Sequence, residues 1–165
     1  MNACNHFVAG IPLRVFASGG VSEKYDTVNR MYGMIEYAGG QVGIIESSKK
    51  ASFNQELQIT CAKAILHLPV TWTPDDAAIR QIRSEVWGQL LTDTCTVGQA
   101  DAYQLQLENF AAAICDQAEP VMPLPESVAN TFTVQALVTS ILEKRIVEIE
   151  LPDLVTSALD KETQK

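Results

Sequence analysis

The chain has 165 residues, of which 47% are hydrophobic and 19% are charged. These values fit one globular domain with its own core. A formal net charge of −8 repels phosphate backbones and anionic headgroups, so we expect neither nucleic acid nor a membrane as a partner. No apolar run approaches the ~20 residues that cross a bilayer, and residues 1–6 lack the features of a signal peptide. We therefore interpret the protein as cytoplasmic.

The four cysteines, Cys4, Cys61, Cys95 and Cys115, lie far apart and form no Cys-x-x-Cys pair. This spacing argues against a zinc knuckle or a redox dithiol. A disulfide framework is also unexpected in a chain of this size with its own core. We therefore predict buried, reduced thiols. The acidic pair at 75–76 has no further ligands at a suitable spacing, so we predict no metal site.

The first part of the chain carries β signals. Residues 11–17 alternate and predict a strand with its odd-numbered residues on one face. The Ser18-Gly-Gly20 stretch is expected to end that strand. Apolar runs at 27–37 and 41–48 flank Ala38-Gly39-Gly40, a link that suits a turn with positive φ. The pattern predicts a hairpin.

Residues 53–61 alternate again, with Phe53, Leu57, Ile59 and Cys61 facing one way. The opposite face is a polar row made of Asn54, Glu56, Gln58 and Thr60. Such a row suits polyol hydroxyls, because these groups donate and accept hydrogen bonds. A solvated face or a wet subunit contact explains it equally well.

A short strand is predicted at 63–70, closed by Pro69 and by the turn at 73–76. Between residues 77 and 97 the pattern is ambiguous. Apolar spacing in its first half fits a helix, whereas residues 92–97 are rich in β-branched side chains. We predict two strands in this region.

From residue 99 the apolar period changes to three and four residues, which indicates an amphipathic helix that ends near Ala118. Its apolar stripe consists of Tyr103, Leu107, Phe110, Ala111 and Ile114. Pro125-Glu126 suits the first turn of a second helix, which continues to about Lys144. This helix is expected to bury Ala129, Phe132, Ala136 and Ile141.

A strand at 145–151 can then return to the sheet, and the polar tail at 152–165 is expected to fray. Strands followed by helices indicate an α+β fold: an open, mostly antiparallel sheet with two long helices packed on one face. We assign residues 1–151 to this domain. Residues 27–48 are apolar on both faces of the hairpin, and an uncovered apolar patch usually marks an interface. We therefore expect a homo-oligomer, most simply a dimer.

Four segments carry a resemblance to a known family. They are 26–48, 59–69, Tyr103-x-x-Gln106-x-x-x-x-Phe110-Ala111 and Pro123-Leu-Pro-Glu126. In this order they resemble the C-terminal domain of the glucose-fructose oxidoreductase / inositol dehydrogenase (Gfo/Idh/MocA) family. Asn130, Ala136 and Ser140 also fall where the family tends to place these residue types. Cys61-Ala-Lys-Ala64 departs from the pattern, because the family usually has a glycine-containing turn there.

The resemblance implies the substrate-side and oligomerisation domain of an NAD(P)-dependent oxidoreductase acting on a sugar, polyol or related hydroxyl compound. NAD or NADP would be held by an N-terminal Rossmann domain, whose glycine-rich turn receives the pyrophosphate. Gly39-Gly40-x-x-Gly43 lacks that spacing. The family's Asp-x-x-x-His motif falls at or before Met1 by residue count. We therefore assign no catalytic or cofactor-binding residue and expect the chain alone to be inactive. The alternative is a free-standing dimerisation or ligand-binding module.

The substrate-side candidates are Asn54, Glu56, Gln58 and Tyr103. The Tyr103 hydroxyl could reach a ligand, although its place on the apolar stripe favours a core or edge role.

The two histidines of the chain are also candidates for functional residues. His6 could act as a general base, but its neighbours Phe7 and Val8 favour a structural role. His67, within a strand, is interpreted as a hydrogen-bonded structural histidine. Trp72 and Trp87 could form a sugar-stacking platform, but ordinary packing is favoured.

Overall fold

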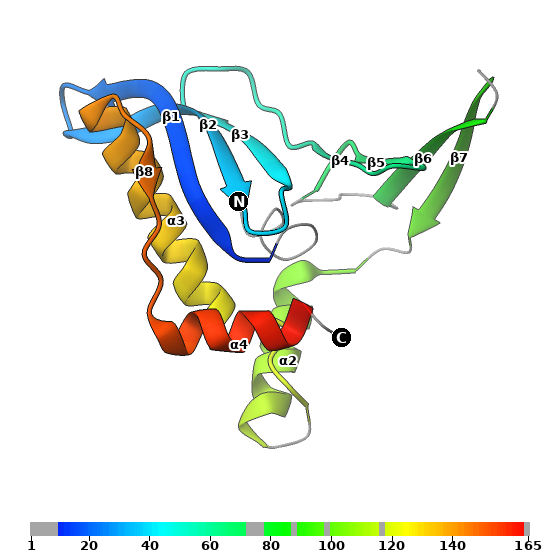
Figure 1. Ribbon diagram of the computed structural model, residues 1–165. Helices are drawn as coiled ribbons and strands as arrows, with labels where there is room; N and C mark the ends of the chain where they lie inside the picture. Colours follow the sequence, from blue (N-terminus) through cyan, green and yellow to red (C-terminus); the bar gives the residue numbers. More distant parts are fainter. Residues whose placement is uncertain (1–9, 72–77, 87–88, 98–99, 116–117, 164–165) are drawn as a thin grey trace. The chain divides into compact units, whose positions relative to one another are not determined.

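The computed structural model describes residues 10–71, 78–86, 89–97, 100–115 and 118–163. The chain divides into two compact units (Figure 1). The first unit combines Met1–Ala51 with Met122–Lys165, and the second is Ser52–Val121.

The first unit contains an open four-stranded sheet and two helices. Its strands are β1 (Pro12–Ser22), β2 (Thr27–Tyr37), β3 (Val42–Ser48) and β8 (Val147–Glu148). They are antiparallel and lie in the order β3-β2-β1-β8. The helices are α3 (Leu124–Glu143) and α4 (Asp153–Thr163). Helix α3 packs against β1 and β2 on one face of the sheet.

The predicted hairpin at 27–48 and the predicted long helix are both confirmed. In the hairpin turn Gly40 has a φ of +81°, a conformation that glycine adopts without a steric penalty. Gly33, in the middle of β2, allows α3 to lie close to the sheet. A Cβ at this position would come within 2.8 Å of Leu137 Cδ2.

Strand β1 does not end at Ser18-Gly-Gly20, contrary to the sequence-based expectation. It continues through both glycines to Ser22. A Cβ on Gly19 would collide with the carbonyl oxygen of Arg30 and lie 3.2 Å from Ile141 Cδ1. Glycine here therefore permits close approach between neighbouring segments instead of breaking the strand.

Leu13 lies outward, although the alternation predicted it to face inward with Val15 and Ala17. The reason is a register shift in the β1–β2 pairing between Pro12 and Arg14. One irregular residue reverses the faces of the residues before it. Pro12 is buried in place of Leu13.

The main core lies between α3 and the inner face of the sheet. It consists of Val15, Ala17, Ile35, Tyr37, Ala136, Leu137 and Ile141. Ala129, Ala136 and Ile141 are buried as predicted, whereas Phe132 is only half-buried. The apolar side chains of one helix face thus cover strands β1 and β2.

The Ser140 side chain connects α3 to the sheet. Its Oγ accepts a hydrogen bond from Ala17 N at 2.9 Å and donates to Arg145 O at 2.6 Å. Strand β8 pairs with β1 at Arg14 and Val15, and the same register continued toward α3 would set Ala17 opposite Arg145. The fully buried hydroxyl therefore replaces the next direct rung of the ladder and satisfies both backbone groups.

The C-terminal segment forms helix α4, so the expectation of a fraying tail was wrong for residues 153–163. Val155 and Leu159 are buried and pack against Ala129. They lie four residues apart, on the same helix face. Because the segment is polar overall, this short apolar stripe was missed.

The second unit contains a four-stranded antiparallel sheet and helix α2 (Ala102–Ile114). Its strands, in spatial order, are β4 (Leu57–Thr60), β5 (Ile65–Leu68), β6 (Ala78–Val86) and β7 (Gln89–Val97). The two strands predicted between residues 77 and 97 are confirmed. The α+β class with an open antiparallel sheet is also confirmed, although the strands divide between two sheets.

Cys61 and Cys115 are free and exposed, so the prediction of buried thiols was wrong for these two. Cys61 follows β4 and Cys115 caps the C-terminus of α2, so both lie at element ends. Cys4 and the side chain of Cys95 lie outside the described residues. Among the helices that the structure describes, none is long and apolar enough to cross a membrane.

The Ser140 bridge predicts a large effect of Ser140→Ala on stability. The substitution leaves a buried N–H and a C=O without a partner, each worth about 1–3 kcal/mol. The free energy of unfolding, measured by urea denaturation, should fall by at least about 1 kcal/mol. Thr131→Ala is the control, since Thr131 is exposed and its hydroxyl bonds only the preceding turn of the same helix. A Ser140 variant as stable as this control would contradict the bridge.

The packing of α4 predicts that Leu159→Ala and Leu154→Ala behave differently. Leu159 is buried, whereas Leu154 is 83% exposed on the same helix. Truncating a buried leucine costs about 2–5 kcal/mol, and an exposed one costs within about 0.5 kcal/mol. Equal unfolding free energies for the two variants would show that α4 adds no packing.

Candidate functional site

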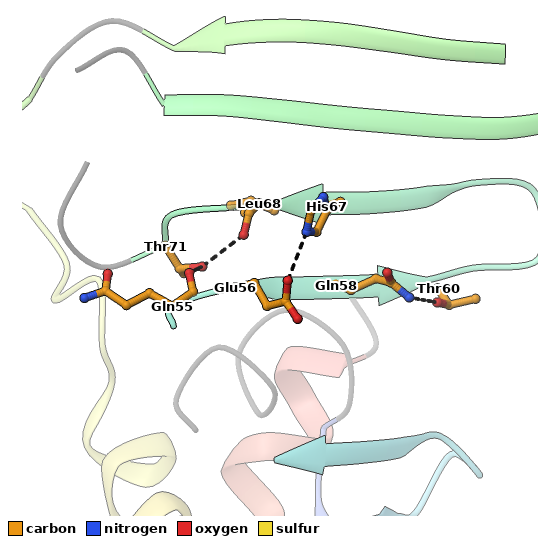
Figure 2. Close-up of polar contacts among 7 residues, drawn as sticks. All are labelled: Gln55, Glu56, Gln58, Thr60, His67, Leu68 and Thr71. Carbon is orange, nitrogen blue, oxygen red and sulfur yellow. Dashed lines mark hydrogen bonds and ion pairs between the residues drawn. The ribbon is translucent and has the colours of Figure 1, made fainter. Parts of the chain in front are cut away.

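Two members of the polar row predicted at 54–60, Gln58 and Thr60, lie on β4 of the second unit, and Glu56 directly precedes that strand (Figure 2). The members of the row, Asn54, Glu56, Gln58 and Thr60, are all exposed. Leu57 and Ile59 are half-buried between them. Phe53 was expected beside these two, yet it precedes β4 and is exposed.

The backbone at the start of the row is fixed by Thr71. The carbonyl oxygen of Gln55 accepts from Thr71 N at 3.0 Å and from Thr71 Oγ1 at 3.1 Å. The same hydroxyl lies 3.4 Å from Leu68 O. Glu56 follows directly, so its backbone is held in place although it precedes the paired residues of β4.

His67 of β5 belongs to the same polar surface. It lies directly opposite Gln58, and opposite residues of paired strands share a face. Its Nε2 lies 3.5 Å from Glu56 Oε2, a long contact that Figure 2 shows between the two facing side chains. The sequence suggested a structural histidine. The pairing of β4 with β5, which a single-strand pattern does not reveal, is what brings His67 beside the row.

Gln58 and Thr60 form the other end of the row. Gln58 Nε2 donates to Thr60 Oγ1 at 3.3 Å (Figure 2). This bond orients the amide, and its carbonyl oxygen can accept a hydrogen bond from a ligand. The hairpin thus presents a carboxylate, an amide and a hydroxyl along one exposed line.

The backbone register extends this line across the sheet. His67 lies opposite Gln81 of β6, and Gln81 lies opposite Thr94 of β7. Residues 58, 67, 81 and 94 are therefore cross-strand neighbours, one on each of the four strands. All four are residue types that form hydrogen bonds.

Tyr103 lies on α2, apart in sequence from the hairpin. Asp101 caps the helix, because its Oδ1 accepts from Tyr103 N at 2.8 Å and Gln104 N at 3.1 Å. The Tyr103 side chain is 75% exposed. The rest of the apolar stripe is exposed as well, and no described residue of α2 is buried. Among the described residues, the Tyr103 side chain is therefore not part of a core.

Several other candidates lie outside the described residues: His6, Trp72, Asp75, Asp76 and Trp87. Within the described ranges, no three His, Cys, Asp or Glu side chains come together as metal ligands.

A second candidate surface is the outer face of the first sheet, opposite α3. Phe16 lies opposite Met34, which lies opposite Ile44, so three large apolar side chains form one rung. Their exposed fractions are 44%, 39% and 82%. We call this rung, together with Tyr32 and Val42, the outer sheet face. Arg14 and Glu36 pair beside it at 2.7 Å, and the hydrogen bond to Glu36 raises the pKa of Arg14.

Comparison with known proteins gives one curated relative and several solved structures. No family model matches the chain. D-xylose 1-dehydrogenase (NADP+) 2 of Haloferax volcanii is 26% identical over 141 residues, which cover 86% of this chain and 43% of that protein.

The structural matches extend over most of the chain. A proposed NADPH-dependent oxidoreductase of Desulfitobacterium hafniense has a TM-score of 0.75 at 20% identity, over 90% of this chain and 45% of its own. Aldose-aldose oxidoreductase of Caulobacter crescentus, solved with glycerol, has a TM-score of 0.70 at 13% identity, over 89% and 44%. At these identities the matches show the fold.

The fold is thus an α+β domain of the kind found in oxidoreductases. These matches confirm the resemblance of the four segments to the C-terminal domain of the Gfo/Idh/MocA oxidoreductases. The chain spans less than half the length of the proteins it matches.

Proposed function

We propose that this chain is the substrate-side and oligomerisation domain of an NAD(P)-dependent oxidoreductase acting on a sugar, polyol or related hydroxyl compound. The observation that carries the proposal is the match to an NADP-dependent D-xylose dehydrogenase along 86% of this chain but only 43% of the relative. The cofactor would be bound by a Rossmann domain in the remaining half of the protein. In this proposal the present chain contacts the substrate and has no catalytic activity by itself.

The substrate-side role rests on Asn54, Glu56 and Gln58. All three residues are exposed at or just before β4, where Thr71 holds the backbone at Gln55. Amide and carboxylate groups form directional hydrogen bonds with hydroxyls, as sugar and polyol recognition requires. Tyr103 is the remaining candidate, through an exposed phenol that can donate to a ligand.

The oligomerisation role rests on the outer sheet face. Phe16, Met34 and Ile44 form one exposed apolar rung across β1, β2 and β3. A contiguous apolar patch of this kind is usually covered by a partner. A second copy is the simplest partner, because a two-fold axis can place the same patch against itself. We propose a homodimer on this basis.

We place the protein in the cytoplasm. Cys61 and Cys115 are unpaired and exposed, a state that a reducing compartment preserves. The acidic net charge of −8 supports the further proposal that neither nucleic acid nor a membrane is a partner.

A second candidate function is a free-standing dimerisation or ligand-binding module without chemistry. It is favoured by the location of both candidate surfaces, the outer sheet face and the polar row, within this chain. Neither surface needs a cofactor to form. The two functions differ in whether a dinucleotide-binding half accompanies the chain.

The coding sequence upstream of Met1 distinguishes these functions. An oxidoreductase domain should be preceded, in frame or in a neighbouring gene, by a glycine-rich Rossmann domain. Expressed together, the two halves should oxidise a sugar or polyol with NAD or NADP. An in-frame stop with no such domain encoded nearby would favour the free-standing module.

Cofactor binding gives a second test. NADP+ or NAD+ should leave the melting temperature of this chain unchanged, because a ligand stabilises only a protein that binds it. The measurement is a thermal scan with and without saturating cofactor. Clear stabilisation would reveal a dinucleotide site in this chain and overturn the assignment.

The dimer proposal predicts that Ile44→Lys produces a monomer. Ile44 is 82% exposed, so the charge should disrupt the contact between copies without disturbing the core. Light scattering should report a dimer for the unmodified chain. Leu154→Lys is the matched control, because Leu154 is 83% exposed on α4, and this variant should stay dimeric. A monomeric unmodified chain, or two variants with equal masses, would contradict the proposal.

A further inference from the structure

The polar row contains a carboxylate that is paired with a histidine across the hairpin. Glu56 and His67 approach each other through Oε2 and Nε2 at 3.5 Å. The His67 side chain is 23% exposed and that of Glu56 is 58% exposed. The histidine is therefore the more buried of the two, and the carboxylate is the more accessible to solvent.

We propose that the Glu56–His67 pair makes the polar row selective for uncharged polyhydroxy compounds over phosphorylated ones. This inference rests on the proposed substrate role of the row and adds the chemical class of its ligand. Glu56 is the group that contacts the ligand, and His67 is a positioning residue that acts through Glu56.

In this arrangement Glu56 accepts hydrogen bonds from the ligand and His67 orients Glu56. A carboxylate has two oxygens with about four acceptor sites. His67 occupies one side of Oε2, so Oε1 remains available to accept hydrogen bonds from ligand hydroxyls. Holding the carboxylate in one orientation reduces the conformational entropy lost when a ligand binds. Gln58 lies next along the row, with its amide oriented by Thr60.

The charge of the pair explains the selectivity. Glu56, the more exposed member of the pair, brings its carboxylate to the surface of the row. Lys63 is the sole Lys or Arg between residues 51 and 71. It lies in the hairpin turn beyond Thr60, at the end of the row away from Glu56. The Glu56 carboxylate would repel a phosphate beside it, whereas a hydroxyl would donate a hydrogen bond to it.

Nuclear magnetic resonance of the whole chain provides the test. Backbone amide shifts are followed during titration with D-glucose, D-xylose or myo-inositol, and separately with D-glucose 6-phosphate. The unphosphorylated compounds should shift the resonances of Glu56, Gln58 and His67. D-glucose 6-phosphate should bind there at least about tenfold more weakly than D-glucose.

Substitutions then assign the preference to the pair. Glu56→Gln should abolish the preference, because the amide keeps the shape and loses the charge. Glu46→Gln, the same change at an exposed residue of β3, should leave it intact. His67→Leu should weaken D-glucose binding, and His67→Gln should restore most of it, because the glutamine amide can donate to Glu56.

Each outcome tests the selectivity of the row, its proposed role in substrate binding or the positioning role of His67. If D-glucose 6-phosphate binds the row as tightly as D-glucose, the selectivity is overturned while the substrate role stands. If none of the unphosphorylated compounds shifts the hairpin resonances, both are overturned. If the two His67 variants bind D-glucose equally, the positioning role is overturned.

Discussion

The first unit depends on one hydroxyl group, Ser140 Oγ. It accepts from Ala17 in the middle of β1 and donates to Arg145, just after the helix. The end of α3, the central strand and the return of the chain into β8 are therefore fixed at a single buried point. Because α3 is held on the inner face, the reverse side of the same strands exposes the apolar rung of Phe16, Met34 and Ile44. The proposed dimer is thus a consequence of how the core is assembled.

Regular periodicity made most of the fold predictable. The alternation and glycine turn at 27–48 and the helical spacing of 124–143 gave elements that the structure confirms. The misses have tertiary causes. Gly19 was taken as a strand breaker, yet its lack of a side chain accommodates Arg30 and Ile141. Leu13 changed face through a register shift that no local pattern reveals. Helix α4 rests on a two-residue apolar stripe too short to stand out in a polar segment.

The sequence predicted those features of the candidate site that depend on a single strand. Alternation predicted one polar face for Asn54, Glu56 and Gln58, and each of the three is exposed in the structure. The proximity of His67 depends on the pairing between β4 and β5, which is a property of two strands together. The exposure of Tyr103 was hidden for a similar reason: helical spacing identifies an apolar stripe but not what covers it.

The central claim is that this domain functions together with other protein, and first of all with a second copy bound to its outer sheet face. Hydroxyl-radical footprinting tests it most directly, by comparing the oxidation of Phe16 and Met34 with that of Tyr25, which is 66% exposed in the β1–β2 turn. On going from dilute to concentrated protein, Phe16 and Met34 should become protected while Tyr25 remains reactive. If all three residues oxidise at rates that do not change with concentration, the outer sheet face has no second copy on it and the account fails.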